Sequence, residues 1–123
     1  MPVFTPDAPT PRGHYSQAVV ANGTVYVAGL LPASPSDGKM LQAGIREQSA
    51  QIFQNLDAIL LAAGSHRSKV VSLQVFLCDL TIWSEINEAC ANYFGEHKPA
   101  RVAVPILPLR DGALLEINAI AVV

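Results

Sequence analysis

The sequence has few charged residues for its size. Only 15% of its 123 residues are Asp, Glu, Lys or Arg, and half are hydrophobic. Globular proteins carry about 25% charged residues, and a small domain has proportionally more surface to coat than a large one. Other subunits that cover part of the apolar surface would reconcile these facts. The composition therefore predicts one domain, residues 1–123, that forms a homo-oligomer.

The sequence also lacks a cluster of basic residues. Its eight Lys and Arg residues are scattered, and the formal net charge is −2. Proteins that bind nucleic acids concentrate cations to neutralise phosphates. We therefore expect no nucleic-acid partner.

Several kinds of motif are missing. There is no CxxC pair, and Cys78 and Cys90 lie in different expected elements, which indicates free, buried thiols in a reducing compartment. No signal peptide is visible, and no apolar run approaches the roughly 20 residues that span a bilayer. The three histidines lack metal-ligand spacing, and no P-loop, HExxH or GxSxG motif occurs. A cytoplasmic protein without a metal site or membrane partner is expected.

Six of the nine prolines fall in the first 35 residues, so the N-terminal third is expected to hold loops and strands. Residues 16–21 and 24–31 are predicted strands joined by the turn Asn22-Gly23. From about residue 42 to 63 the apolar residues recur with helical spacing, and Gly64 is placed to end that helix.

Alternation then returns over residues 70–78, where Val71, Leu73, Val75 and Leu77 are predicted to share one face. A second helix is expected between Asp79 or Thr81, either of which can cap it, and Gly95. Its predicted buried stripe consists of Trp83, Ile86, Cys90, Tyr93 and Phe94.

Residues 100–106 and 113–122 are predicted to form two last strands. The order of elements predicts an α+β fold, with a mainly antiparallel sheet and two helices on one face. The other face of such a sheet must also be covered, and the low charge content indicates that other subunits cover it.

Two charged residues stand in apolar strands. Arg101 lies near the start of the strand Ala-Arg-Val-Ala-Val, and Glu116 lies inside Leu-Leu-Glu-Ile-Asn-Ala-Ile. Charges are rarely buried without a partner. One interpretation is that the two residues pair with each other or reach solvent. The other is functional: Arg101 holds a small carboxylate with its planar fork, and Glu116 is an acid, a base or a water-orienting group. Tyr15 could line such a pocket.

Several segments in the same order resemble the RidA/YjgF family of enamine and imine deaminases. The matching segments are Gly-His-Tyr-Ser-Gln-Ala-Val at 13–19, Thr-Val-Tyr-Val-Ala-Gly-Leu-Leu-Pro at 24–32, Asn-Leu-Asp-Ala-Ile-Leu at 55–60, Ala-Ala-Gly at 62–64, Val-Phe-Leu-Cys-Asp-Leu at 75–80, Ile-Asn at 86–87, Tyr-Phe-Gly-Glu at 93–96, Pro-Ala-Arg at 99–101 and Glu-Ile-Asn-Ala-Ile-Ala at 116–121. The resemblance extends over nearly the whole chain.

The resemblance implies a chorismate-mutase-like homotrimer with a cleft at each subunit interface. Such proteins hydrolyse species like 2-aminoacrylate to 2-oxo acids and ammonia without a cofactor. By the same resemblance Arg101 binds the substrate carboxylate, Tyr15 lines the pocket and Glu116 positions water. Gly29 offers a backbone N–H, and Asn87 supports the cleft.

The sequence departs from the family pattern at several pocket positions. Ala28 stands where the family has serine, and Leu30 replaces a glutamine. After Pro-Ala-Arg, Val102 replaces a serine and Ala103 takes a position often held by cysteine or alanine. His14 replaces a proline. We expect a more apolar pocket, with altered specificity or rate.

Three alternatives therefore stay open beside a deaminase of small imino acids. Ala28 and Leu30 favour a larger catabolic enamine, such as 2-aminomuconate. A trimer that binds small carboxylates without catalysis would keep Arg101, although it would not need Glu116. RNA cleavage, an activity attached by name to some relatives, is disfavoured by the acidic net charge and the absence of a histidine pair.

Overall fold

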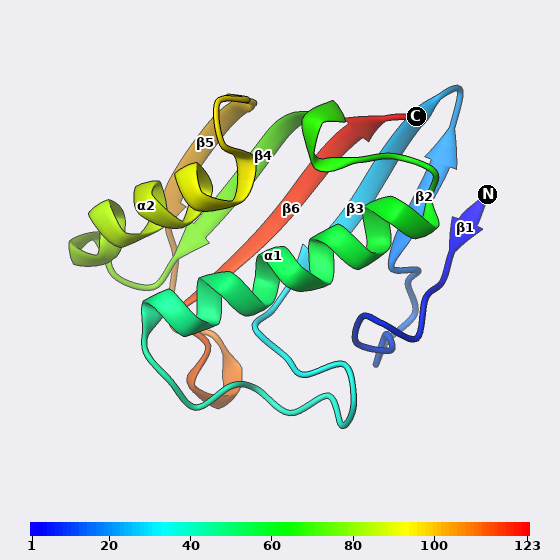
Figure 1. The fold of residues 1–123 in the computed structure, drawn as a ribbon. Coiled ribbons are helices and arrows are strands. Elements are labelled where there is room, and N and C mark those ends of the chain that lie inside the picture. Colours follow the sequence, from blue (N-terminus) through cyan, green and yellow to red (C-terminus); the bar gives the residue numbers. More distant parts are fainter.

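The computed structural model describes residues 1–123 and contains one six-stranded sheet with two helices on one face (Figure 1). The strands run in the order β1-β2-β3-β6-β4-β5, and only β4 and β5 are parallel. The α+β prediction is confirmed. The bounds of the elements are β1 Pro2–Val3, β2 Ala18–Ala21, β3 Thr24–Leu30, α1 Ile45–Ala62, β4 Val70–Leu77, α2 Trp83–Phe94, β5 Ala100–Pro105 and β6 Leu115–Val122.

Helix α1 follows the predicted period and lies along the centre of the sheet (Figure 1). Its inward residues Ile52, Leu56, Ile59 and Leu60 are fully buried. Gly64 adopts a left-handed conformation with a φ of 79° just after the helix, as expected. The helix begins at Ile45 rather than near residue 42 because the backbone before it forms hydrogen bonds with another loop. There the N–H of Leu41 donates to the carbonyl of Pro32 at 2.8 Å.

The sheet contributes the other half of the core. Its inward residues alternate along the strands, and each of Val25, Leu73, Val75, Leu77 and Leu115 is at most 1% exposed. Strands β4 and β6 form the longest ladder, with Leu77 opposite Leu115 and Val75 opposite Ile117. The central strands therefore fix which side chains face the helices and which face away.

Two predicted placements are wrong, the face shared by Val71 and the burial of Trp83. Val71 is 47% exposed, because the register of β4 against β6 shifts between Val70 and Ser72 and leaves one extra residue in β4. Trp83 is 41% exposed, since it is the first residue of α2 and lies at the margin of the core. Asp79 caps the short turn before α2 by accepting a hydrogen bond from the N–H of Thr81, and its pKa is lowered chiefly by that bond.

The face of the sheet away from the helices carries a row of exposed apolar side chains. Val19 lies opposite Tyr26, and Tyr26 lies opposite Ile120 across β2, β3 and β6. Val122 and Val102 are also exposed, on β6 and on the edge strand β5. We call this surface the open face.

Neither helix has the length and apolar character that crossing a membrane requires.

Candidate functional site

Glu116 lies on the open face, and its carboxylate is placed over Gly29. Its position in the sheet follows from its partner, because Glu116 pairs with Phe76, whereas the neighbouring Leu115 and Ile117 point toward the helices. Between Val27 and Leu30 the register of β3 against β6 shifts by one residue. A side-chain Cβ at Gly29 would be 2.9 Å from the Oε2 of Glu116. The absence of a side chain at Gly29 is thus what lets the carboxylate rest there.

Tyr15 joins this bulge from the N-terminal loop. Tyr15, Ala28, Gly29 and Leu30 line one small hollow of about 60 Å³, which we call the Tyr15 hollow. Gln17 holds the loop in place. Its buried side chain accepts from the N–H of Thr5 and donates to nearby carbonyls, and its backbone carbonyl accepts from the N–H of Ala28 at 3.0 Å. The structure therefore brings four predicted site residues together and places Glu116 beside them.

Arg101 lies on the helix side of the sheet. It pairs with the buried Leu73 across the parallel β4–β5 ladder, so its side chain is directed toward α2. There one guanidinium nitrogen donates to the Oδ1 of Asn87 at 2.7 Å. The guanidinium carbon lies 4.8 Å from the centre of the Trp83 ring, within the range of a cation–π contact. Arg101 and Asn87, both predicted site residues, thus lie together, and they line a pocket of about 390 Å³.

The thiol of Cys90 is the third contact of this guanidinium, with a nitrogen-to-sulfur distance of 3.6 Å. Burial raises the pKa of Cys90, although the neighbouring Arg101 opposes the shift. The thiol is therefore neutral near pH 7 and does not neutralise the arginine. Cys90 and Cys78 are both free thiols, as expected, but they are half-buried rather than buried.

Sequence reasoning missed Trp83 and Cys90 as partners of Arg101. A signal was present, because Trp83, Asn87 and Cys90 are spaced i, i+4 and i+7 and so share one face of a helix. Ala103, predicted to contact substrate, is half-buried two residues after Arg101. It pairs with Val75 and packs against the core.

The predicted site residues thus form two groups in one chain. The first contains Tyr15, Ala28, Gly29, Leu30 and Glu116, and the second contains Asn87, Arg101 and Ala103. Strands β3 and β5 are three steps apart in the sheet, which is roughly 14 Å at about 4.8 Å per step. Arg101 and Glu116 also point to opposite faces. They do not pair with each other within one chain.

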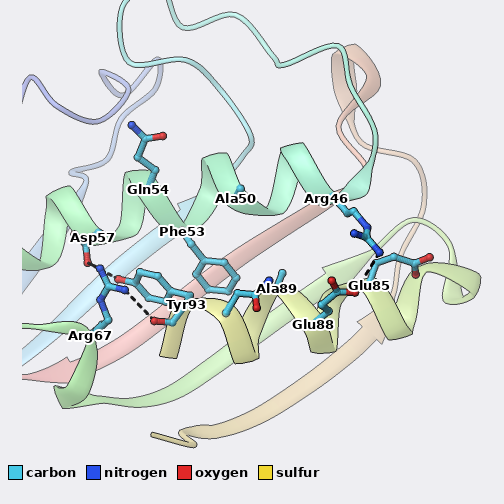
Figure 2. Close-up of a pocket in the computed structure, with 11 residues that line it drawn as sticks. Arg46, Ala50, Phe53, Gln54, Asp57, Arg67, Glu85, Glu88, Ala89 and Tyr93 are labelled. Atoms are coloured by element: carbon cyan, nitrogen blue, oxygen red, sulfur yellow. Dashed lines mark hydrogen bonds and ion pairs between the residues drawn. The ribbon is translucent and has the colours of Figure 1, made fainter. Parts of the chain in front are cut away.

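A further hollow, of about 420 Å³, lies elsewhere, between α1 and α2 on the outer surface (Figure 2). We call it the interhelix groove. Four of its charged side chains form ion pairs, because Arg46 pairs with Glu88 at 3.3 Å and Arg67 pairs with Asp57 at 3.2 Å. Tyr93 donates to Asp57 at 2.9 Å and lies under the Arg67 guanidinium.

Burial and the adjacent Asp57 raise the pKa of Tyr93, so its hydroxyl stays protonated. Phe53 stacks on its ring with 4.7 Å between ring centres. These contacts join the two helices, and both arginines of the groove have a carboxylate partner.

Comparisons with known proteins bear on this geometry. The family model described as Endoribonuclease L-PSP matches residues 5–123. A RutC family protein of Pyrococcus horikoshii is 43% identical over 119 residues, which cover 97% of this chain and 94% of that protein. A 2-iminobutanoate/2-iminopropanoate deaminase of Rattus norvegicus is 39% identical over 120 residues, which cover 98% of this chain and 88% of that protein.

The fold also has close counterparts among solved structures. The crystal structure of RidA from the Antarctic bacterium Psychrobacter sp. has a TM-score of 0.95 and 36% sequence identity. The likeness covers 100% of this chain and 99% of that chain. The similarity therefore includes every strand and helix that positions the two groups of site residues.

Proposed function

This chain belongs to the RidA/YjgF family, whose sequence model is described as Endoribonuclease L-PSP, and we propose that it hydrolyses small enamine and imine intermediates to 2-oxo acids and ammonia. Relatives in rat and human are named 2-iminobutanoate/2-iminopropanoate deaminases. The observation that carries the proposal is a pair of half-buried charges, one suited to binding a carboxylate and one suited to activating water. Arg101 is a cation without a carboxylate partner, and Glu116 is a carboxylate without a cation.

In this proposal Arg101 binds the substrate carboxylate. The guanidinium presents a planar fork of donors that fits a carboxylate, and Asn87 holds it from one side. The neutral thiol of Cys90 leaves the positive charge available. The contact with Trp83 limits where the fork can point.

Glu116 positions and activates water in the same proposal. An enamine first takes a proton at its β-carbon and becomes an imine. Water then adds to the imine carbon while Glu116 accepts a proton of that water. Glu116 returns the proton to the nitrogen, and ammonia leaves as the hydroxyl loses its proton and the carbonyl of the 2-oxo acid forms. Because the imine carbon is already electrophilic, orientation of substrate and water supplies most of what the reaction needs.

The active unit in this proposal is a homotrimer with a cleft at each interface. Arg101 and Glu116 lie on opposite faces and two strand steps apart, so one chain alone cannot apply both to one small substrate. A neighbouring copy that lays its β5 edge beside the Tyr15 hollow would complete the site. The exposed apolar row of the open face supports such contacts.

The pocket departures bear on which substrate is used. Ala28 lies in the bulge beside Gly29, over which the water-activating glutamate rests, whereas Leu30 pairs with Ile117 and is buried against the core. Both apolar side chains line the Tyr15 hollow. They favour a substrate with an apolar stem, including a larger catabolic enamine. A trimer that binds carboxylates without catalysis is the competing proposal. The free thiols fit a reducing compartment such as the cytoplasm.

An imine-hydrolysis assay tests this proposal. An amino-acid oxidase generates imines from several amino acids in the presence of semicarbazide, which traps the imine that has not been hydrolysed. We expect the protein to suppress semicarbazone formation and to speed the release of ammonia. Tight binding of 2-oxo acids without any effect on imine lifetime would favour the non-catalytic alternative.

A further inference from the structure

The lining of the Tyr15 hollow includes two arginines, although the chain as a whole is negative. Its lining contains Arg12 and Arg110 and no Asp or Glu, in a chain with a formal net charge of −2. The interhelix groove also contains two arginines, but three acidic residues lie among them. A hollow that gathers cations without acids is suited to an anionic group.

Arg12 is the cation of this hollow that has no acidic partner. One of its guanidinium nitrogens donates to the carbonyl of Asp37 at 3.1 Å, and none of the ion pairs of the structure includes it. The guanidinium lies flat against Gly38, where a Cβ would be 2.5 Å from the Nη2 of Arg12. Arg110 differs, because it already pairs with Asp111 at 3.3 Å. A guanidinium has five N–H donors, so Arg12 keeps most of its donors for a ligand.

We infer that Arg12 binds a second carboxylate at the far end of the substrate, which makes 2-imino dicarboxylic acids the preferred substrates. This inference rests on the proposed function. In that function Arg101 of a neighbouring copy holds the first carboxylate, and Glu116 acts on the imine carbon next to Gly29. Because Gly29 also lines the Tyr15 hollow, the rest of the substrate extends toward Arg12.

The hollow fits this assignment in size and character. Its volume of about 60 Å³ admits one end of a small acid rather than a whole substrate. Ala28 and Leu30 offer apolar contact to the methylene groups between the two carboxylates. The reaction itself is unchanged: water adds to the C=N bond, ammonia leaves, and the second carboxylate takes no part.

A matched pair of five-carbon imines tests the inference. L-Glutamate oxidase produces 2-iminoglutarate from glutamate, and L-amino-acid oxidase produces 2-iminopentanoate from norvaline. The two imines differ only in the terminal carboxylate. We expect kcat/KM to be about tenfold higher for 2-iminoglutarate, as one added charge-assisted contact would give. We expect Arg12→Gln, which retains a donor for the Asp37 carbonyl, to abolish most of that preference.

Arg46→Gln is the control, because it removes an arginine from the interhelix groove and should keep the native ratio of the two rates. If Arg12 only joins the two loops, Arg12→Gln lowers Tm but keeps that ratio, and the inference is overturned while the deaminase stands. Equal or slower hydrolysis of 2-iminoglutarate by the native protein overturns it in the same way.

If neither imine is hydrolysed, the proposed function fails, and competition between 2-oxoglutarate and 2-oxopentanoate for binding still tests the second anchor. Preference for 2-oxoglutarate that is lost in Arg12→Gln would support the anchor. Equal binding of the two acids would overturn it.

Discussion

The carboxylate of Glu116 occupies the space that a side chain at Gly29 would fill, since a Cβ built there is 2.9 Å from its Oε2. The two residues come from different strands, β3 and β6, and meet only because the register shifts between Val27 and Leu30. Gly29 does not have a positive φ. The position therefore calls for glycine because of space and not because of backbone strain.

Gly29→Ala should accordingly displace Glu116 without unfolding the protein. The added methyl group must push the carboxylate away, and a displacement of about 1 Å at a reacting group can cost roughly a hundredfold in rate. We expect kcat for imine hydrolysis to fall by about that factor while the circular dichroism spectrum stays native. Gly44→Ala is the control, because Gly44 also lies near a glutamate, Glu47, but at the start of α1. Native turnover in Gly29→Ala would show that Glu116 takes no part in the reaction.

Arg101→Lys should lose most activity while the fold survives. An ammonium cannot reproduce the planar fork that donates to Asn87 and to a carboxylate together. We expect kcat/KM to fall by about 10- to 100-fold, with the larger part in KM. Arg67→Lys, in the interhelix groove, serves as the matched control. Near-native kinetics in Arg101→Lys would assign Arg101 to the structure of the α2–β5 contact instead.

Trp83 should report the binding of a carboxylate at Arg101. It is the only tryptophan of the chain, and its ring centre is 4.8 Å from the guanidinium carbon. A ligand that draws the guanidinium away changes the surroundings of the indole, so we expect saturable changes in fluorescence on titration with butanoate, which does not absorb in the measured range. Arg101→Lys should shift the midpoint to higher concentration, and Arg46→Lys should not. A titration that is identical in all three proteins would contradict the assignment.

The sequence predicted the elements well where one period dominates. Helix α1 buries Ile52, Leu56 and Ile59 as its spacing required. The bulge that exposes Val71 was not predictable, because it arises from how β4 pairs with β6 and not from β4 itself.

The two charged residues could be identified from sequence, but their geometry could not. Arg101 and Glu116 stand out as charges in apolar strands. The side of the sheet on which each one lies depends on its partner, Leu73 for Arg101 and Phe76 for Glu116. A slip of one residue in either register would reverse the face. The division of the site into two groups therefore needed the structure.

Glu116→Gln separates catalysis from binding. The substitution keeps the shape of the side chain and a hydrogen-bonding group, and it removes the charge that activates water. We expect kcat to fall by roughly two to four powers of ten if Glu116 is a general base. Binding of an inert 2-oxo acid should change little or improve, since a repelling charge is gone. Unchanged turnover would rule out this mechanism, and a change in affinity alone would favour a binding protein.

Mixing two impaired variants tests whether each site takes residues from two copies. Arg101→Lys retains Glu116, and Glu116→Gln retains Arg101. If one copy supplies Arg101 and its neighbour supplies Glu116, a hybrid trimer contains interfaces where both native residues meet. Random assembly of equal amounts should make about a quarter of the sites native. We therefore expect activity to return to about a quarter of the wild-type value after the two proteins are unfolded and refolded together.

The same proteins refolded separately and then mixed are the control for this recovery, because their subunits have not been redistributed during assembly. Arg101 and Glu116 lie on opposite faces of one chain, so they cannot meet on one small substrate without a second copy. A site contained within one chain could never become native in such a mixture, since every chain carries one defect. Absence of recovery in hybrids that sedimentation shows to have formed would therefore overturn the shared site, and a stable 13.1 kDa monomer of the native protein would overturn the assembly itself.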